Sequence, residues 1–183
     1  MKHSDRWNPL EENEFINDVD TSADVIISNT TKHNSGTDSF WPRAEENLLK
    51  AFEFYFLETV SANNNLTTIY QKIASGDLKE INDMFTKLDE DSPARMSYNI
   101  FASGSDTIKA SVITGLGTRL QLFQNEDLQK LTSFSDIDLS LPGKEPCIYY
   151  TILSDTNSAY DFIRFTILHI FIYKTNSICR FTA

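Results

Sequence analysis

The stretch DSFWPRAEENLLKAFEFYF, residues 38–56, carries the strongest structural signal in this chain. Asp38 or Ser39 can cap a helix here, and Pro42 suits its first turn. Apolar residues then form two adjoining stripes at helical spacing: Ala44, Leu48, Ala51 and Tyr55 on one, and Leu49, Phe52, Phe56 and Val60 on the other. A helix that is apolar over so much of its surface is normally central. The pattern therefore predicts a core helix with other helices packed around it.

Five further helices are predicted downstream of this core helix, from apolar spacing and from signals at their ends. Ser92 and Pro93 fit the cap and first turn of one helix, and Gly76 and Gly104 fit helix ends. Gly115 lies within another, where its lack of a side chain would let a neighbouring helix approach closely. The predicted helices cover residues 66–76, 77–88, 92–104, 105–123 and 125–133.

The two ends of the chain differ from its middle in the pattern of apolar and polar residues. Residues 1–37 read as irregular, with the short apolar segment ADVIISNT inside a polar frame. Near the other end, the β-rich run CIYYTILSD, residues 147–155, predicts a buried strand, and residues 158–173 predict a helix after it. The last stretch, KTNSICRFTA, shows no obvious role in a cap or core. A single central strand is not stable alone, so this β-α unit predicts a sheet to which the chain contributes one strand.

Composition places the chain among single-domain globular proteins. It has 183 residues, 40% of them hydrophobic, and a net charge of −10, enough for one core and hardly for two. The acidic balance opposes broad binding to a phosphate backbone, because nucleic-acid-binding proteins usually present a basic surface. The N-terminus has no apolar signal region. The most apolar stretch, residues 162–173, is too short for a membrane span and contains Arg164 and His169. The chain itself therefore reads as cytoplasmic.

Known phosphate and metal motifs fit the sequence poorly. Gly143-Lys144 resembles the end of a phosphate-binding P-loop, but Glu145 follows where Ser or Thr is required. Gly115-Leu116-Gly117 lies in a predicted helix, which favours helix packing over dinucleotide binding. Asp136 and Asp138 resemble half of a calcium loop, yet the glycine and the distal glutamate are missing. Solvated turn acids are the better interpretation of these two residues.

Individual reactive residues likewise define no site. His3, His33 and His169 share no metal-ligand spacing, and Cys147 and Cys179 form no CxxC pair and no disulfide framework. Trp7 and Trp41 could stack on bases, but both precede proline-containing segments and are better read as packing anchors. We therefore assign no catalytic, cofactor-binding or metal-binding residue, and the residues alone predict a soluble helical protein with an interaction or structural role.

Four phrases, in order, resemble the TraG/TraD-type coupling proteins of type IV secretion and conjugation systems, closest to members from Gram-positive mobile elements. They are SDRWNPL, then DSFWPRAEENLLKAF, then SGSDTIKASVITGLGTRLQLF, and finally the segment that begins LTSFSDIDLSLPGKEP and runs into CIYYTILSDTNSAYDFI. The resemblance covers about residues 4 to 170. Between residues 66 and 104 only the helical pattern matches.

This resemblance implies a fold and a division of the chain. The family is a membrane-anchored, hexameric P-loop ATPase with an all-α domain inserted into its nucleotide-binding domain. By that resemblance, residues 1–37 lead in from the nucleotide-binding domain, residues 38–143 form the all-α domain, and residues 144–183 are a strand-helix return. The expected fold is mainly α, a helical bundle followed by one β-α unit of an incomplete α/β domain.

The resemblance also implies a function. In the family, ATP and magnesium drive transfer of relaxase-bound DNA to the secretion channel, and the all-α domain is implicated in recognising the relaxosome or another secretion substrate. The chain contains neither the Walker A loop nor the Walker B strand, so we expect a truncated fragment without its own catalysis or cofactor. The full-length protein would act at the cytoplasmic face of the membrane. The alternative is a self-standing helical interaction or regulatory module.

Overall fold

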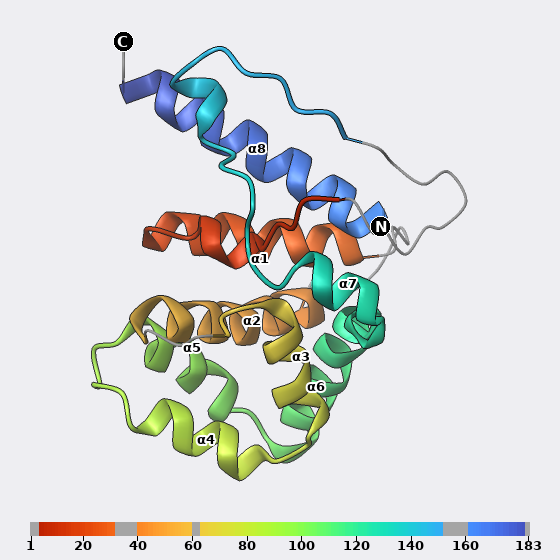
Figure 1. Ribbon diagram of the computed structural model, residues 1–183. Coiled ribbons are helices and arrows are strands. Elements are labelled where there is room, and N and C mark those ends of the chain that lie inside the picture. The colour runs from red at the N-terminus through yellow and green to blue at the C-terminus, as the bar shows by residue number, and fades with distance from the viewer. Residues whose placement is uncertain (1–3, 32–39, 60–62, 152–160, 182–183) are drawn as a thin grey trace.

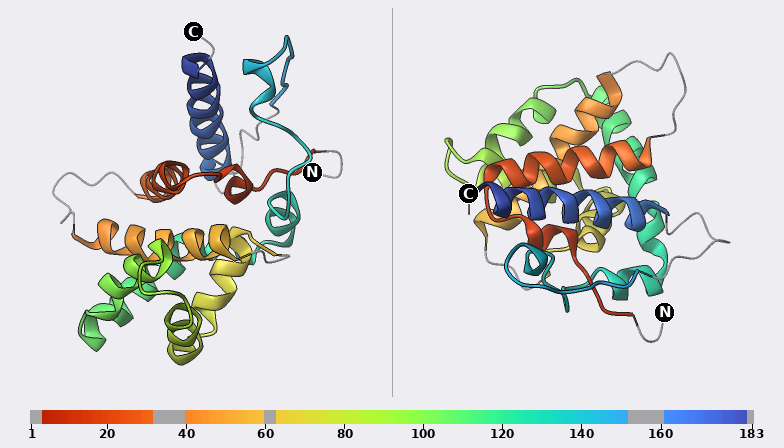
Figure 2. Two further views of the ribbon diagram at one scale, coloured as in Figure 1. Left: turned by 90° about the vertical axis from the view of Figure 1, so that its left-hand side faces the viewer. Right: turned by 90° about the horizontal axis from the view of Figure 1, so that it is seen from above.

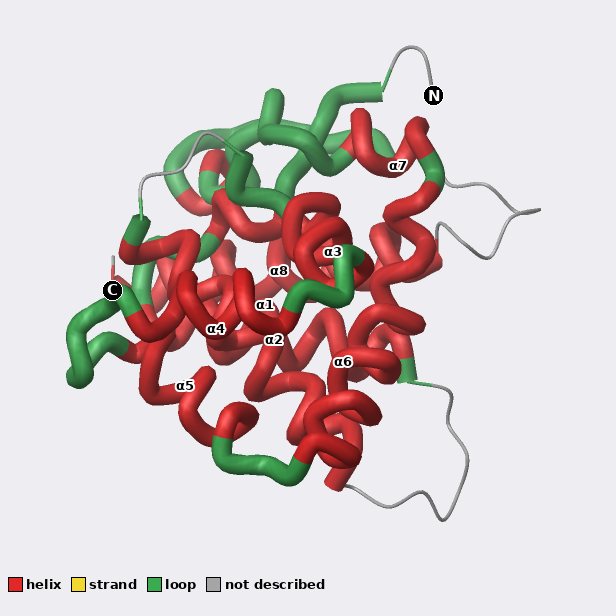
Figure 3. Tube along the Cα trace, turned by 90° about the horizontal axis from the view of Figure 1, so that it is seen from below, coloured by secondary structure: helices red, strands yellow, loops and turns green. Residues whose placement is uncertain are grey.

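The chain folds into layers of helices, as the computed structural model shows (Figure 1). The structure describes residues 4–31, 40–59, 63–151 and 161–181, and no strand occurs among them (Figure 3). The mainly helical fold expected from the sequence is confirmed. The elements are η1 (Pro9–Glu12), α1 (Ile16–Thr30), α2 (Phe40–Glu58), α3 (Leu66–Ala74), α4 (Leu78–Thr86), α5 (Pro93–Ala102), α6 (Asp106–Leu120), η2 (Gln121–Gln124), α7 (Glu126–Leu131), η3 (Leu141–Gly143) and α8 (Asp161–Phe181).

Helix α2 is the central element, as its two apolar stripes predict. Leu48, Leu49, Ala51 and Phe52 are at most 1% exposed. Helix α1 packs on one side of α2, while α5 and α6 pack on its others, and α8 lies beyond α1 (Figure 2). The expected caps Asp38 and Ser39 lie outside the described residues, as does Val60.

Stacked aromatic rings fill the space between α2, α4 and α5. The rings of Phe85 and Tyr98 stack with centroids 4.3 Å apart, and Phe52 meets Phe85 edge-on at 5.4 Å. These arrangements are favoured by the ring quadrupole and add to the free energy gained by burial. Helix α5 begins as predicted, because the Ser92 hydroxyl accepts a hydrogen bond from the Arg95 amide at 3.2 Å and itself donates to Glu58 of α2 at 2.6 Å.

Of two expectations for the ends of the chain, the structure shows that the first is wrong and does not show the second. The first is irregular structure throughout residues 1–37, because residues 16–30 form helix α1. Its apolar residues, Val19, Ala23, Ile26 and Ile27, follow helical spacing and are buried against the core. The Asp18 carboxylate accepts hydrogen bonds from the Glu14 and Phe15 amides, both at 3.0 Å, and so closes the first turn. The many polar residues in this segment obscured the helical spacing of its apolar residues, so the helix was not predicted from the sequence.

The second is the strand at residues 147–155. Residues 147–151 form a loop in the structure, and 152–155 lie outside the described residues. Tyr149 attaches this loop to the fold: its hydroxyl donates to the Asp138 carbonyl, and its ring meets that of Phe171 edge-on at 6.0 Å. A β-rich segment forms a strand only where a second strand supplies hydrogen bonds, and none is present in the described part of the chain. The finer expectation of a β-α unit is not shown.

Helix α8 is longer than the sequence predicts. It continues past Tyr173 to Phe181, through residues to which the sequence assigned no role. Within this extension the Lys174 side chain is only 11% exposed, and its ammonium lies 3.8 Å from the Asp18 carboxylate and 3.6 Å from that of Glu14. Lys174 thus joins the second half of α8 to the start of α1.

A buried ion pair joins three other helices. Arg119 of α6 binds the Glu45 carboxylate of α2 through its Nε, and both side chains are largely buried. The same guanidinium donates to the Thr31 hydroxyl at 2.9 Å and to the Thr30 hydroxyl at 3.2 Å, at the end of α1. Gly115 makes the arrangement possible, because a Cβ at this position would lie 1.9 Å from Glu45 Oε1. The close approach predicted at Gly115 is therefore real, although a carboxylate makes it.

We predict that Gly115→Ala destabilises the protein, although alanine is the better helix former by about 1 kcal/mol. The added methyl group displaces Glu45 and leaves Arg119 buried with poorer hydrogen bonds, at a net cost of about 1–3 kcal/mol. Urea unfolding measures this change.

Gly117→Ala is the matched control, because its Cβ would meet only Ile73 Cγ2, at 3.3 Å. We expect this control to stay within about 1 kcal/mol of the original protein, the gain in helix propensity offsetting a tight contact. Equal destabilisation by the two substitutions would contradict the role given to Glu45.

Candidate interaction surfaces

The outer side of α8 is apolar and exposed to solvent. Phe165, Leu168 and Ile172 are 42%, 43% and 55% exposed, at positions that follow one stripe along the helix. Ile148 and Tyr150 of the preceding loop are 76% and 87% exposed. We call these five residues the α8 outer face. Exposed apolar groups gathered on one helix and its neighbouring loop are typical of an interaction surface.

The opposite side of α8 packs on its own chain through both polar and apolar side chains. Thr166 is fully buried, and its hydroxyl accepts a hydrogen bond from Asn29 of α1 at 3.3 Å. Lys174 follows on the same side with its ion pairs to α1. Apolar side chains also face inward: Phe162 packs against Phe123, and Ile170 joins Trp7 and Leu139. Helix α8 is thus held to its own chain by apolar packing and polar contacts, and three large apolar side chains remain exposed on its outer side.

A second surface is a shallow groove between the start of α2 and the first half of α6. Trp41 forms one wall and is 38% exposed, with its ring edge-on to that of Phe40 at 5.1 Å. The floor consists of short side chains of α6, and the buried Glu45 lies beneath it. The lining residues are Trp41, Glu45, Asp106, Thr107, Ala110, Ser111, Thr114 and Gly115. We call this the α2–α6 groove.

The two tryptophans therefore differ. Trp7 is a packing anchor, as predicted: it is 3% exposed, packs with Leu139 and Ile170, and donates through Nε1 to Glu12 at 3.0 Å. Burial raises the pKa of that Glu12 carboxyl, and the Trp7 hydrogen bond partly opposes the shift. Trp41 remains available on the surface. Both residues were interpreted as packing anchors from the sequence, because their different burial depends on helices distant in the chain.

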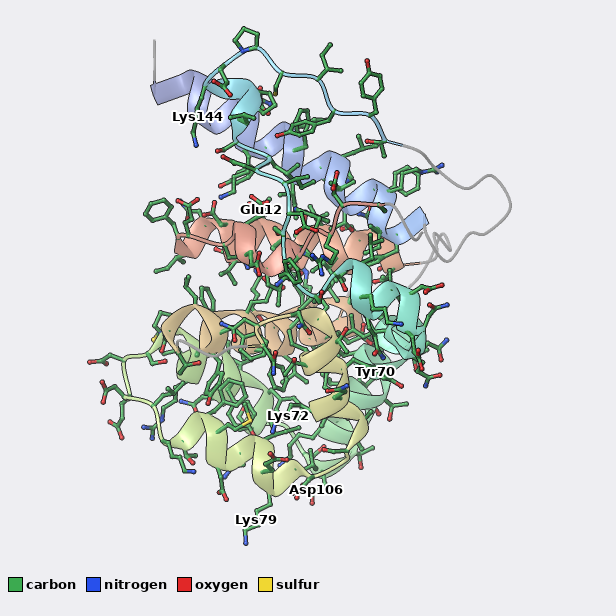
Figure 4. The ribbon with its side chains drawn as sticks, viewed as in Figure 1. Glu12, Tyr70, Lys72, Lys79, Asp106 and Lys144 are labelled. Carbon is green, nitrogen blue, oxygen red and sulfur yellow. The ribbon has the colours of Figure 1, made fainter. Side chains whose placement is uncertain are left out.

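The remaining motif residues have structural roles in turns. The Arg6 guanidinium forms an ion pair with Asp136 at 2.8 Å, which lowers the pKa of that carboxyl. Hydrogen bonds from Ser140 lower the pKa of Asp138. Lys144, the lysine of the failed P-loop match, contacts Ser140 and Asp138 (Figure 4). The interpretation of these aspartates as solvated turn acids is confirmed.

Reactive residues do not gather elsewhere in the described part of the chain. No three histidine, cysteine or acidic side chains come together there as a metal site would require. His169 is exposed on α8 and Cys147 is half-buried in the loop before it, while His3 and His33 lie outside the described residues. Among the described helices, none is long and apolar enough to cross a membrane.

One buried carboxyl stands out electrostatically. Glu53 of α2 is 1% exposed at the contact with α1 and accepts a hydrogen bond from Asn13 at 2.9 Å. Ser22 of α1 is its other close polar neighbour, and Lys50 and Asp20 act on it from further away with opposite signs. Burial raises the pKa of Glu53 to about 8, so the folded protein holds it protonated at neutral pH. Nothing in the local sequence distinguishes Glu53 from the half-buried Glu46 or the exposed Glu58 on the same helix.

These geometries define a class of protein: a helical unit with two candidate interaction surfaces, one apolar and one formed by a tryptophan and short side chains. Comparison with protein families identifies which unit it is. The family model described as "Type IV secretory system Conjugative DNA transfer" matches residues 1–177. The chain therefore belongs to this family of conjugative DNA-transfer proteins, and the expected resemblance is confirmed. Comparison with curated proteins and with solved structures found no match.

We predict that Glu53→Gln changes the pH dependence of stability. Between pH 4.5 and about 8 the unfolded chain releases the Glu53 proton while the folded chain keeps it, so this residue lowers the free energy of unfolding as pH rises. A glutamine cannot ionise and keeps the hydrogen bond from Asn13. The stability gained by the variant should grow from near zero at pH 4.5 to about 2–4 kcal/mol at pH 8.

Urea denaturation at several pH values measures this difference. Glu46→Gln is the control, because Glu46 lies half-buried in an ion pair with Lys50 at 2.8 Å rather than enclosed in the core. A stability difference between Glu53→Gln and the original protein that does not change with pH would contradict the protonated state of Glu53.

Proposed function

We propose that this chain is the substrate-recognition part of a coupling protein, the P-loop ATPase that brings relaxase-bound DNA to a type IV secretion channel. Membership of the conjugative DNA-transfer family supports the setting. The α8 outer face is the observation that carries the proposal. It lies at one end of the layered fold (Figure 1), where an apolar surface would meet the remainder of the nucleotide-binding domain.

In this proposal the helices within residues 38–143 form the recognition unit, and the loop before α8 together with α8 attaches it to the motor. The β-rich segment at residues 147–151, a loop that Tyr149 holds against Asp138 and Phe171, fits such an attachment, because a sheet of the motor would supply the strand partner that the described chain lacks. ATP, magnesium and hexamer formation at the cytoplasmic side of the membrane would belong to the full-length protein. This chain would contribute recognition without catalysis.

The partner we propose is the relaxase or another protein of the relaxosome, rather than bare DNA. The net charge of −10 opposes contact with a phosphate backbone. The alternative is a self-standing interaction or regulatory module. In that case the α8 outer face would stay exposed to solvent and the chain would remain a monomer.

Binding of the purified chain to the relaxase of the same mobile element tests this function. At about 0.15 M salt, where exposed charges are largely screened, we expect a complex with the relaxase on size exclusion, no complex with single-stranded DNA alone, and no ATP hydrolysis by the chain. Binding to DNA without binding to the relaxase, or ATP turnover that is lost on mutation of the chain, would contradict the proposal.

We further predict that the isolated chain self-associates through the α8 outer face. The double variant Leu168→Gln, Ile172→Gln should shift sedimentation velocity toward the monomer and leave the melting temperature nearly unchanged, because both side chains are already partly exposed. The control is Met96→Gln, Ile100→Gln on α5, which removes apolar residues that are 58% and 60% exposed. An equal effect of both double variants would contradict a specific role for α8.

A further inference from the structure

The α2–α6 groove combines a shape and a chemistry that suit one kind of ligand. Its floor is made by Thr107, Ala110, Ser111 and Thr114, all short and all on the exposed side of α6. Two helices approach most closely where their facing side chains are small. The aromatic wall at Trp41 turns this flat floor into a groove, and a helix lying in it would gain contact along one side from the indole ring.

The charged residues of the groove are both acidic. Glu45 is neutralised by Arg119 beneath the floor. Asp106, at the start of α6, has a fully exposed side chain, and its contact with Lys109 at 3.2 Å is a surface ion pair of little energetic value. Figure 4 shows Asp106 at the end of the molecule opposite Lys144 and α8, well away from the α8 outer face. Among the residues that the structure describes, the groove has an exposed carboxylate and no basic lining residue, which favours a basic ligand.

Among basic ligands, the indole ring of Trp41 favours arginine. An indole face attracts guanidinium groups by cation–π contact, and arginine can stack on a ring while its N–H groups bind a carboxylate. Trp41 and Asp106 belong to different helices that border the same groove. An arginine entering between them would satisfy both groups at once.

We propose that the α2–α6 groove binds an amphipathic helix of a partner protein, which places bulky apolar side chains over the short residues of α6 and an arginine between Trp41 and Asp106. This inference rests on the proposed recognition function and assigns it a surface and a ligand class. Nucleic acid is not favoured, because the described lining of the groove offers no positive charge to phosphate. A second copy of the chain is a separate outcome, which the experiment detects.

The probe is a synthetic 18-residue helical peptide of leucine, alanine and arginine, with the arginines along one edge of its apolar face. Intrinsic fluorescence reports binding, because Trp7 is buried and a change on titration comes from the exposed Trp41. In about 0.15 M salt, which screens exposed charges, we expect a saturable shift of the emission. A peptide with glutamate in place of each arginine should produce none.

Two variants locate the binding. Ala110→Leu fills the floor of the groove and should weaken binding of the peptide at least about tenfold, a loss of about 1.4 kcal/mol in binding free energy. Ala110 is exposed and leucine is a good helix former, so circular dichroism should show an unchanged fold. Asp106→Asn should weaken binding about 3- to 10-fold, because it removes the carboxylate that meets the arginine. Asp127→Asn on α7 makes the same charge change outside the groove and should have no effect.

The outcomes separate cleanly. Unchanged affinity of Ala110→Leu, an equal loss for Asp106→Asn and Asp127→Asn, or tight binding of the glutamate peptide would each overturn the proposal. In the Leu168→Gln, Ile172→Gln variant, which lacks the apolar side chains expected to drive self-association through α8, a concentration-dependent shift of Trp41 fluorescence without peptide, matched by dimers in sedimentation, would assign the groove to a second copy and overturn the proposal as well. If Ala110→Leu still binds the relaxase as the original chain does, the groove proposal fails while the proposed function stands. If the original chain fails to bind the relaxase, the proposed function fails.

Discussion

The fold depends on one buried ion pair. Arg119 of α6 holds Glu45 of α2 and, through the same guanidinium, the hydroxyl groups at the end of α1, so a single side chain fixes three helices. A buried pair stabilises only when further hydrogen bonds satisfy both charges, and Gly115 provides the space that lets Glu45 adopt the required position. The apolar core around α2 makes the helices associate, and this polar junction sets how they are arranged. It also sets the α2–α6 groove, because Glu45 and Gly115 lie in its lining.

The side of α8 that packs on the chain and the side that faces solvent differ in their contacts. Against α1, α8 presents Thr166 and Lys174, whose burial is tolerated because Asn29, Asp18 and Glu14 pair with them. Toward solvent it presents Phe165, Leu168 and Ile172. The result is a helix that is specifically positioned on its own chain and remains available to another surface. Asp106 of the α2–α6 groove lies at the opposite end of the molecule from α8 (Figure 4), so the proposed attachment and the proposed partner contact use separate surfaces.

Sequence patterns predicted those parts of the fold that depend on residues close together in the chain. The burial of α2 follows from its two apolar stripes, and the start of α5 follows from Ser92 and Pro93. Helix α1 was missed because its four buried apolar residues are separated by Asp, Ser and Thr. Residues 147–151 form a loop although their β-rich sequence predicts a strand, because strand formation depends on a second strand that a single segment cannot reveal. The pairing of Glu45 with Arg119 spans 74 positions, and neither this contact nor the exposure of Trp41 leaves a signal in the neighbouring sequence.

The internal ion pair of Arg119 and Glu45 sets the arrangement of the helices, and we propose that the partner contact lies in the α2–α6 groove, away from α8. Hydrogen–deuterium exchange of the chain with and without the relaxase tests this most directly, because it maps protection along the backbone. The account predicts slower exchange at the start of α2 and along Asp106–Gly115 of α6 when the relaxase is added, with α3 and α7 unchanged. Protection confined to α8, or protection that appears only with single-stranded DNA, would contradict it.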